Sequence, residues 1–314
     1  MVKLLDAGFS TQLSKYIDEE IDGHPLWTAR FLFTSKETCL RVHRDFVRAG
    51  AQIIITGSYQ ASIEGFKKYL GLDRETSISL IKESVTLAKN ALETEEKNTG
   101  KKLHVRIAGS IGPYGAYLHD GSDYTGSYAQ KLSKEELKVW HKPRLDALLD
   151  GGADLLAFET IPASIEAEAL IELLKEHPQK KAWLSFSCKD NERISNGETF
   201  KDVAIKCWEL GQSQLIAIGV NCVQPSFVTP LLAKVRETHP EIPLIAYPNS
   251  GEIYSKEKGR WLDKTTSLCV TDYTEEWLDL GINYIGGCCR TNDKDVKQFS
   301  EEIEKWMNKT KTQC

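Results

Sequence analysis

The sequence predicts an α/β protein, a (β/α)8 barrel of the TIM type built as a single domain over residues 1–314. Eight short apolar runs end at Gly, Pro or a polar residue, and polar stretches with helical periodicity separate them. The runs are continuously hydrophobic, which is typical of parallel strands buried on both faces. This repeated alternation of strand and helix favours a closed barrel. A doubly wound open sheet is the alternative, because strand order cannot be read from the sequence.

The eight expected strands are spread along the whole chain. In chain order they are residues 3–6, 53–57, 105–109, 155–159, 183–187, 215–221, 244–247 and 284–287. The expected helices are residues 35–48, 74–96, 133–150, 164–176, 225–237, 274–280 and 293–307. Ser133 and Glu136 have the spacing of a capping box, and Gly151-Gly152 ends the same helix.

Two long stretches, residues 8–34 and 109–132, interrupt this regularity. Each directly follows an expected strand. In a barrel, segments that follow strands lie on the face that carries the active site. We therefore expect both insertions to contact the substrates.

Composition excludes several classes of protein. The 314 residues carry a net charge of -5, and the basic residues are dispersed, so a nucleic acid is not an expected partner. No apolar run approaches the ~20 residues of a membrane span, and the N-terminus does not resemble a signal peptide. We expect a cytoplasmic protein that acts on small molecules, with no membrane association and no obligate protein partner.

Three of the eight cysteines predict a metal site. Cys222 follows the sixth expected strand, and Cys288 and Cys289 follow the eighth. Barrel closure would bring these strand ends to one rim, where three thiolates can hold Zn²⁺ and leave its fourth position open, as in catalytic sites. Adjacent residues of a regular strand point to opposite faces, so both Cys288 and Cys289 reach one ion only if the backbone turns irregularly. Gly286-Gly287 can supply that freedom.

The other cysteines suggest ordinary roles. Cys39, Cys207 and Cys269 are interpreted as buried apolar fillers, and Cys314 as part of a frayed tail. Core packing and a vicinal disulfide are the alternatives for Cys288-Cys289. The spare candidate ligand is Cys188, after the fifth strand.

The predicted ligand set favours thiol chemistry. Three thiolates leave a Zn²⁺ site with a net charge of about -1, which activates water weakly but can still deprotonate a thiol. Asp6 and Glu159 fall at strand ends, where their charges would suit the α-amino group of an amino-acid substrate. Helix capping or loop solvation is the alternative role for either acid. The pattern therefore indicates alkylation of an amino-acid thiol rather than hydrolysis.

The glycine-rich residues 109–115 do not form a phosphate loop, because no Gly-Lys-Ser/Thr follows and Pro113 lacks a backbone donor. Tyr114, Tyr117, Tyr124 and Tyr128 cluster after them. Aromatic faces of this kind can bind a sulfonium or quaternary ammonium cation, or the segment can be a packed lid.

Eight motifs resemble those of the homocysteine S-methyltransferase family, almost from end to end of the chain. They are residues 6–13, 55–62, 109–115, 120–126, 159–162, 219–222, 247–252 and 286–290. The resemblance implies a zinc-containing homocysteine-binding barrel in which Cys222, Cys288 and Cys289 bind the metal and the homocysteine sulfur takes the fourth position. It also implies that Asp6 and Glu159 hold the amino group of the substrate.

The resemblance further implies a homocysteine S-methyltransferase that transfers a methyl group from a sulfonium donor to the homocysteine thiolate, forming L-methionine. Residues 112–117 and 120–126 are similar to the branch that uses S-methylmethionine or S-adenosylmethionine, rather than betaine. Thr56 and Asn221 are assigned to substrate binding. Tyr114 and Tyr124 are assigned to the donor.

Two positions differ from the usual family pattern. Ala7 stands where Gly is common, and Gly57-Ser58 replaces Thr-Asn. Two rival functions remain open at this point. One is methyl transfer from a folate or corrinoid partner, which the short chain disfavours. The other is a binding protein with a structural zinc, which requires a fourth protein ligand such as Cys188 or a His.

Overall fold

The computed structural model describes residues 2–255, 260–262 and 268–313. Within this part of the chain, eight parallel strands form one sheet in the order β1-β10-β7-β6-β5-β4-β3-β2. The strands are β1 (Lys3–Leu4), β2 (Ile53–Ile55), β3 (Arg106–Ile111), β4 (Leu155–Ile161), β5 (Ala182–Phe186), β6 (Leu215–Asn221), β7 (Leu244–Tyr247) and β10 (Ile282–Ile285). A bridge between Leu5 and Ile53 joins the two ends of the sheet. The predicted (β/α)8 barrel is confirmed, and the open sheet is excluded.

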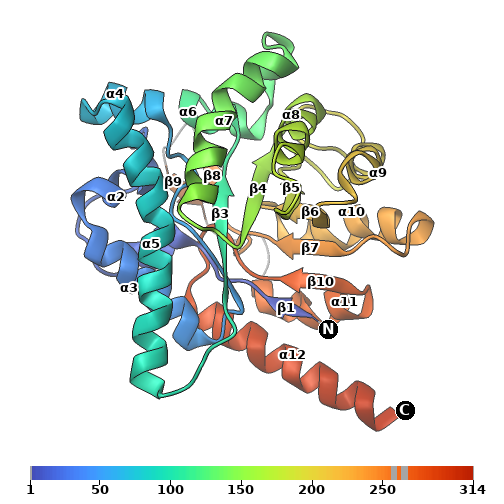
Figure 1. The fold of residues 1–314 in the computed structure, drawn as a ribbon. Coiled ribbons are helices and arrows are strands. Elements are labelled where there is room, and N and C mark those ends of the chain that lie inside the picture. Colours follow the sequence, from blue (N-terminus) through green and yellow to red (C-terminus); the bar gives the residue numbers. More distant parts are fainter. Residues whose placement is uncertain (1, 256–259, 263–267, 314) are drawn as a thin grey trace.

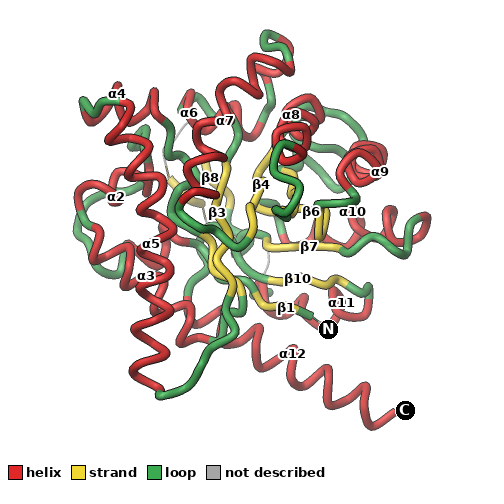
Figure 2. The backbone as a smooth tube through the Cα atoms, in the orientation of Figure 1, coloured by secondary structure: helices red, strands yellow, loops and turns green. Residues whose placement is uncertain are grey.

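Helices surround the strands on the outside (Figure 1; Figure 2). The principal helices are α3 (Lys36–Ala49), α4 (Ile63–Leu70), α5 (Arg74–Thr99), α7 (Lys134–Asp150), α8 (Ser164–Lys175), α9 (Phe200–Gly211), α10 (Pro225–Thr238), α11 (Thr274–Asp279) and α12 (Asp293–Gln313). All seven predicted helices are present, whereas α4 and α9 were not predicted. The predicted capping box is also confirmed, because Ser133 Oγ accepts from Glu136 N and the Glu136 carboxylate accepts from Ser133 N, at 3.2 and 2.8 Å.

The inside of the barrel is filled by side chains from the strands. Leu5, Trp183, Ala217 and Ile245 belong to one buried cluster there. A larger cluster packs the outer faces of the strands against the helices. Gly219 lets two strands approach closely, because a Cβ at this position would lie 1.9 Å from Ile245 O. The close packing makes the barrel a rigid support for its rim.

The two predicted insertions follow β1 and β3. The first contains α1 (Phe9–Leu13), a 3₁₀ turn at Trp27–Arg30 and α2 (Phe31–Thr34). The second contains α6 (Tyr114–Leu118) and 3₁₀ turns at Ser122–Tyr124 and Ser127–Gln130. An antiparallel hairpin, β8 (Ile253–Ser255) with β9 (Arg260–Leu262), follows β7 and was not predicted. All three segments therefore extend from the carboxyl ends of strands.

None of the helices in the described residues combines the length and the apolar character needed to cross a membrane.

Candidate active site

A cavity of about 810 Å³ opens at the carboxyl ends of the strands. Its size falls within the range of small-molecule sites in proteins, roughly 300–1,000 Å³. Both insertions contribute to its lining, for example through Phe9 and Trp27 from the first and Asp123 and Tyr124 from the second. Both insertions therefore border the cavity, and their contact with substrates stays a prediction.

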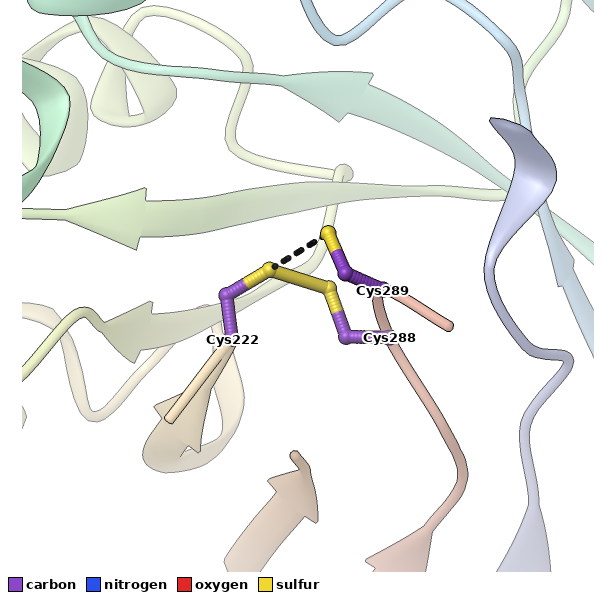
Figure 3. Close-up of side chains that lie close together, drawn as sticks. All are labelled: Cys222, Cys288 and Cys289. Carbon is purple, nitrogen blue, oxygen red and sulfur yellow. Dashed lines mark hydrogen bonds between the residues drawn. A yellow bond between two sulfur atoms is a disulfide. The ribbon is translucent and has the colours of Figure 1, made fainter. Parts of the chain in front are cut away.

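The three predicted ligand cysteines meet in this cavity. Cys222 follows β6, and Cys288 and Cys289 follow β10, and their sulfur atoms all lie within 4.8 Å of one another. Figure 3 shows the three side chains directed toward a common point from two segments of the chain. In the described residues, no further His, Cys, Asp or Glu joins this group. The described part of the chain therefore brings together three candidate ligands and no fourth.

Local backbone geometry places these sulfurs. Cys222 has a left-handed backbone with φ of 51°, which turns its side chain away from the course of β6. We expected Gly286 and Gly287 to supply an irregular backbone turn, but neither residue has a positive φ. These glycines instead permit close packing: a Cβ would lie 2.6 Å from Leu5 Cβ at Gly286 and 2.3 Å from Thr291 Oγ1 at Gly287.

Cys222 and Cys288 are joined by a disulfide, and Cys289 Sγ lies 3.6 Å from Cys222 Sγ (Figure 3). The disulfide makes this an oxidised form of the cluster. Two-electron reduction would convert Cys222 and Cys288 back to thiols. Three sulfurs bound to one tetrahedral Zn²⁺ at ~2.3 Å would be about 3.8 Å apart. The Cys222–Cys289 separation fits that requirement, so the reduced cluster suits a zinc ion. The structure gives no support to a vicinal Cys288–Cys289 disulfide.

Of the five remaining cysteines, the structure describes four. Cys39 and Cys207 are buried, as predicted. Cys269 is exposed, so its assignment as a buried filler is wrong. It stands at the N-cap of the 3₁₀ turn Val270–Tyr273, where its backbone N–H bonds to the Asp272 carboxylate, and such a cap lies at the surface. Cys188 lines the cavity but is not part of the metal group, and Cys314 lies outside the described residues.

Asp6 and Glu159 both line the cavity, and burial raises the pKa of each. Asp6 is 2% exposed; its Oδ2 accepts from Ile55 N at 2.7 Å, while its buried Oδ1 has no partner. The pKa of Glu159 is raised to about 7 by burial, against the opposing effect of hydrogen bonds from Ser110 and Tyr247. The nearby Glu159 carboxylate also raises the pKa of Asp6, which adds to the cost of ionising that group. A cation between them would relieve that cost.

Thr56 and Asn221 line the same cavity with side chains that are already engaged in the protein. Thr56 Oγ1 accepts from Ser110 N at 2.9 Å and contacts Ser58 Oγ at 2.7 Å. Asn221 bonds to the backbone and side chain of Thr160.

The two tyrosines assigned to the donor lie in different places. Tyr124 lines the cavity and is 44% exposed. Tyr114 does not belong to the described lining; its ring packs edge-on against Tyr117 and Trp140 and tilted against Tyr128. The structure thus brings one of the two tyrosines to the cavity and places the other in an aromatic cluster beside it.

Sequence reasoning did not assign a role to Ser110 or Tyr247, although both bond to Glu159. Ser110 Oγ donates to Glu159 Oε1, and the Tyr247 hydroxyl donates to Glu159 Oε2 at 3.1 Å. Polar residues at the ends of buried strands were the available signal, since Tyr247 ends β7 and Ser110 lies next to the last residue of β3.

The unusual Gly57 has a clear structural reason. A Cβ at this position would lie 2.8 Å from the Phe9 ring, which lines the cavity and packs 5.1 Å from the His43 ring. Gly57 therefore leaves space for the Phe9 ring at the side of the cavity. The other unusual residue, Ala7, is nearly buried and also lines the cavity.

Comparison with known proteins identifies the family of this chain. The family model for homocysteine S-methyltransferase matches residues 3–303. A betaine-homocysteine S-methyltransferase from Drosophila melanogaster is 48% identical over 95% of this chain and 92% of its own length. A homocysteine S-methyltransferase from Escherichia coli (strain K12) is 41% identical over 94% of this chain and 93% of its own.

Solved structures agree as well. The homocysteine methyltransferase MmuM from Escherichia coli, in its oxidised and metallated forms, superposes with a TM-score of 0.84 at 38% identity over 96% of each chain. The protein is therefore an enzyme of the homocysteine S-methyltransferase family.

Proposed function

We propose that this enzyme, a single barrel over residues 1–314, catalyses zinc-dependent methyl transfer from a sulfonium donor to L-homocysteine, forming L-methionine. The observation that carries the proposal is the group of three cysteine sulfurs at a cavity wall, without a fourth protein ligand in the described residues. A structural zinc site would be closed by a fourth ligand, whereas an open site admits a substrate atom.

In this proposal the reduced side chains of Cys222, Cys288 and Cys289 hold the zinc. When bound, zinc supplies a positive charge that lets a thiol lose its proton at neutral pH. We also propose a cytosolic location, because a reducing compartment keeps these cysteines as thiols.

Asp6 and Glu159 are proposed to bind the α-ammonium group of homocysteine. The unpartnered Oδ1 of Asp6 supports this assignment, because a buried acceptor without a donor is costly and an ammonium group supplies three donors. Thr56 and Asn221 are proposed to shape the same subsite, since their own polar groups bond within the protein.

The charge of the cavity supports a cationic methyl donor. Its described lining includes the acidic residues Asp6, Asp120, Asp123, Glu159 and Glu252 and contains no Lys or Arg. Arg290, outside this lining, pairs with Glu252. All three donors carry a carboxylate, but S-methylmethionine and S-adenosylmethionine have a net charge of +1, whereas betaine has no net charge. A cavity with this lining favours the net cation.

The proposed reaction is a direct displacement. The homocysteine sulfur attacks the methyl carbon, a new S–C bond forms as the C–S bond of the sulfonium breaks, and the donor leaves as a neutral thioether. The thiol proton goes to solvent. The residues of the chain contribute by holding the two substrates in line, and such alignment can supply up to roughly 7–11 kcal/mol of barrier reduction. No protein base acts on carbon.

Betaine is the second candidate donor. The observation that favours it is the 48% identity to a Drosophila melanogaster protein named betaine-homocysteine S-methyltransferase. Tyr124 at the cavity wall could contact a quaternary ammonium as well as a sulfonium.

Methionine formation from homocysteine tests the proposal and separates the donors. Reduced, zinc-loaded enzyme would be supplied in parallel with S-methylmethionine, S-adenosylmethionine or betaine. We expect turnover with a sulfonium donor, loss of turnover on chelation and recovery with zinc. Turnover with betaine alone would replace the donor assignment, and no methionine from any donor would refute the proposed function.

A further inference from the structure

Strand β4 contains an irregularity at the residues next to Glu159. Phe158 pairs with Leu184 and Ile161 pairs with Phe186, so β4 has one more residue than β5 over this interval. The extra residue makes a β-bulge, a feature that re-aims side chains beside active sites. The bulge lies at Glu159 and Thr160, and both residues line the cavity.

Thr160 is held in an unfavourable conformation. Its φ is 60°, in the left-handed region, where a β-branched residue is a genuine outlier. A conformation of this kind costs on the order of 1–3 kcal/mol and persists only where surrounding groups enforce it. Hydrogen bonds from neighbouring residues must therefore hold Thr160 in this conformation.

The side chain of Asn221 makes two of the hydrogen bonds that hold Thr160, and Ser187 Oγ donates a third, longer one to the Thr160 carbonyl at 3.3 Å. Asn221 Oδ1 accepts from Thr160 N at 2.7 Å, and Asn221 Nδ2 donates to Thr160 Oγ1 at 2.8 Å. Asn221 is 1% exposed, so these bonds are shielded from water. The Asn221 amide thus forms hydrogen bonds to both the backbone and the side chain of Thr160.

Two further side chains, Ser185 and Tyr247, lie between Asn221 and Glu159. Ser185 Oγ lies 2.8 Å from Asn221 Oδ1 and 2.6 Å from the Tyr247 hydroxyl, and its single proton serves one of these contacts at a time. Tyr247 in turn donates to Glu159. Asn221 is therefore connected to Glu159 through the backbone of Thr160, whereas Ser185 and Tyr247 pack between the two residues without a continuous chain of hydrogen bonds.

Asn221 is also the residue directly before Cys222, whose φ of 51° is left-handed too. One side chain thus connects the bulge that carries Glu159 to the turn that carries a cluster sulfur. We propose that Asn221 is a positioning residue that fixes the separation between the Cys222 sulfur and the Glu159 carboxylate, and thereby selects homocysteine over cysteine, which is one methylene shorter. This proposal rests on the proposed function, in which Glu159 binds the substrate ammonium.

The central test compares acceptors in wild type and Asn221→Ala, each reduced and zinc-loaded. We expect KM for homocysteine to rise about 10- to 100-fold, the range for leaving a buried polar group unpaired, with a smaller change in kcat. The preference for homocysteine over cysteine, measured as a ratio of kcat/KM values, should fall. Zinc content should stay at the wild-type value.

Three further variants separate positioning from general damage. Thr160→Gly in the Asn221→Ala background should recover part of the KM loss, because glycine adopts a positive φ without strain. Asn221→Ala should add little in a Glu159→Gln background, since it acts through Glu159. Asn283→Ala is the matched control: Asn283 Oδ1 accepts from Leu244 N at 3.0 Å at the opposite end of β7, so its loss should lower stability without changing KM.

If Asn221→Ala does not fold, Thr160→Val decides the question, because it keeps the shape of Thr160 and removes the hydroxyl that Asn221 binds. We then expect KM for homocysteine to rise about 2- to 10-fold. Unchanged KM and acceptor preference in these variants, or fully additive effects with Glu159→Gln, would overturn the inference. If the wild-type enzyme does not methylate homocysteine, the proposed function fails and the inference fails with it. If the wild type is active and the variants behave like it, only the inference fails.

Discussion

The Tyr247 hydroxyl donates a hydrogen bond to Glu159 Oε2 across 3.1 Å, from the end of β7 to the end of β4. The Trp183 indole donates to the same hydroxyl oxygen at 2.9 Å. Both Tyr247 and Trp183 are fully buried inside the barrel. The position of the Glu159 carboxylate is therefore set by the barrel core as well as by its own strand.

Tyr247→Phe should weaken homocysteine binding. Removal of the hydroxyl takes one donor from Glu159 and leaves the Trp183 N–H without its acceptor. We expect KM for homocysteine to rise roughly 10-fold and the free energy of unfolding to fall by about 1–3 kcal/mol, the usual cost of an unpaired buried group. Steady-state kinetics and denaturant unfolding would measure the two effects. An unchanged KM would show that Tyr247 does not act through Glu159.

Activity should decline in mild acid. The pKa of Glu159 is raised to about 7 by burial, and its ionised form is the one that attracts an ammonium group. As pH falls through about 7 the carboxyl becomes neutral, so kcat/KM for homocysteine should fall toward a tenfold loss per pH unit. Glu159→Gln should have a low kcat/KM that does not change as the pH passes through about 7, because glutamine does not titrate. Zinc content must be measured at each pH, because cysteine protonation releases metal.

Cys289→Ala should abolish zinc binding and activity together while the barrel stays folded. Cys207→Ala is the matched control, because Cys207 is buried in α9 and belongs to the outer core. That control should keep its zinc and its turnover. Metal analysis, methionine assays and circular dichroism on both variants would give the comparison. Full zinc occupancy in Cys289→Ala would refute the ligand assignment.

The disulfide form should not bind zinc, because two of its three ligand sulfurs are bonded to each other. Treatment with a thiol reductant should expose two more titratable thiols per chain and restore zinc binding. Thiol titration paired with metal analysis before and after reduction would test this. Equal zinc affinity in both redox forms would contradict the three-cysteine site.

The sequence predicted the barrel and the cysteine cluster because both depend on signals that local patterns carry. Continuous apolar runs marked all eight strands, and barrel topology alone brings Cys222 to Cys288. Helix α9 was missed, and its N-cap residue Thr199 makes no side-chain cap. The burial of Cys269 was predicted wrongly, because a lone cysteine gives no sign of whether it stands in the core or in a surface turn.

Contacts across the barrel interior were beyond prediction from the sequence. Tyr247 and Glu159 are 88 residues apart on strands that are not neighbours in the sheet. The hydrogen bonds between Asn221 and Thr160 depend on a bulge in β4, and the apolar pattern of the sequence does not reveal that bulge. Both relationships arise only when the strands are placed in register.

X-ray absorption at the zinc edge of the reduced, zinc-loaded enzyme tests the central claim most directly. Without homocysteine we expect three sulfur neighbours and one lighter, exchangeable ligand, and with homocysteine four sulfur neighbours. Four protein ligands that do not change when homocysteine is added would contradict an open catalytic site and would indicate a structural zinc instead.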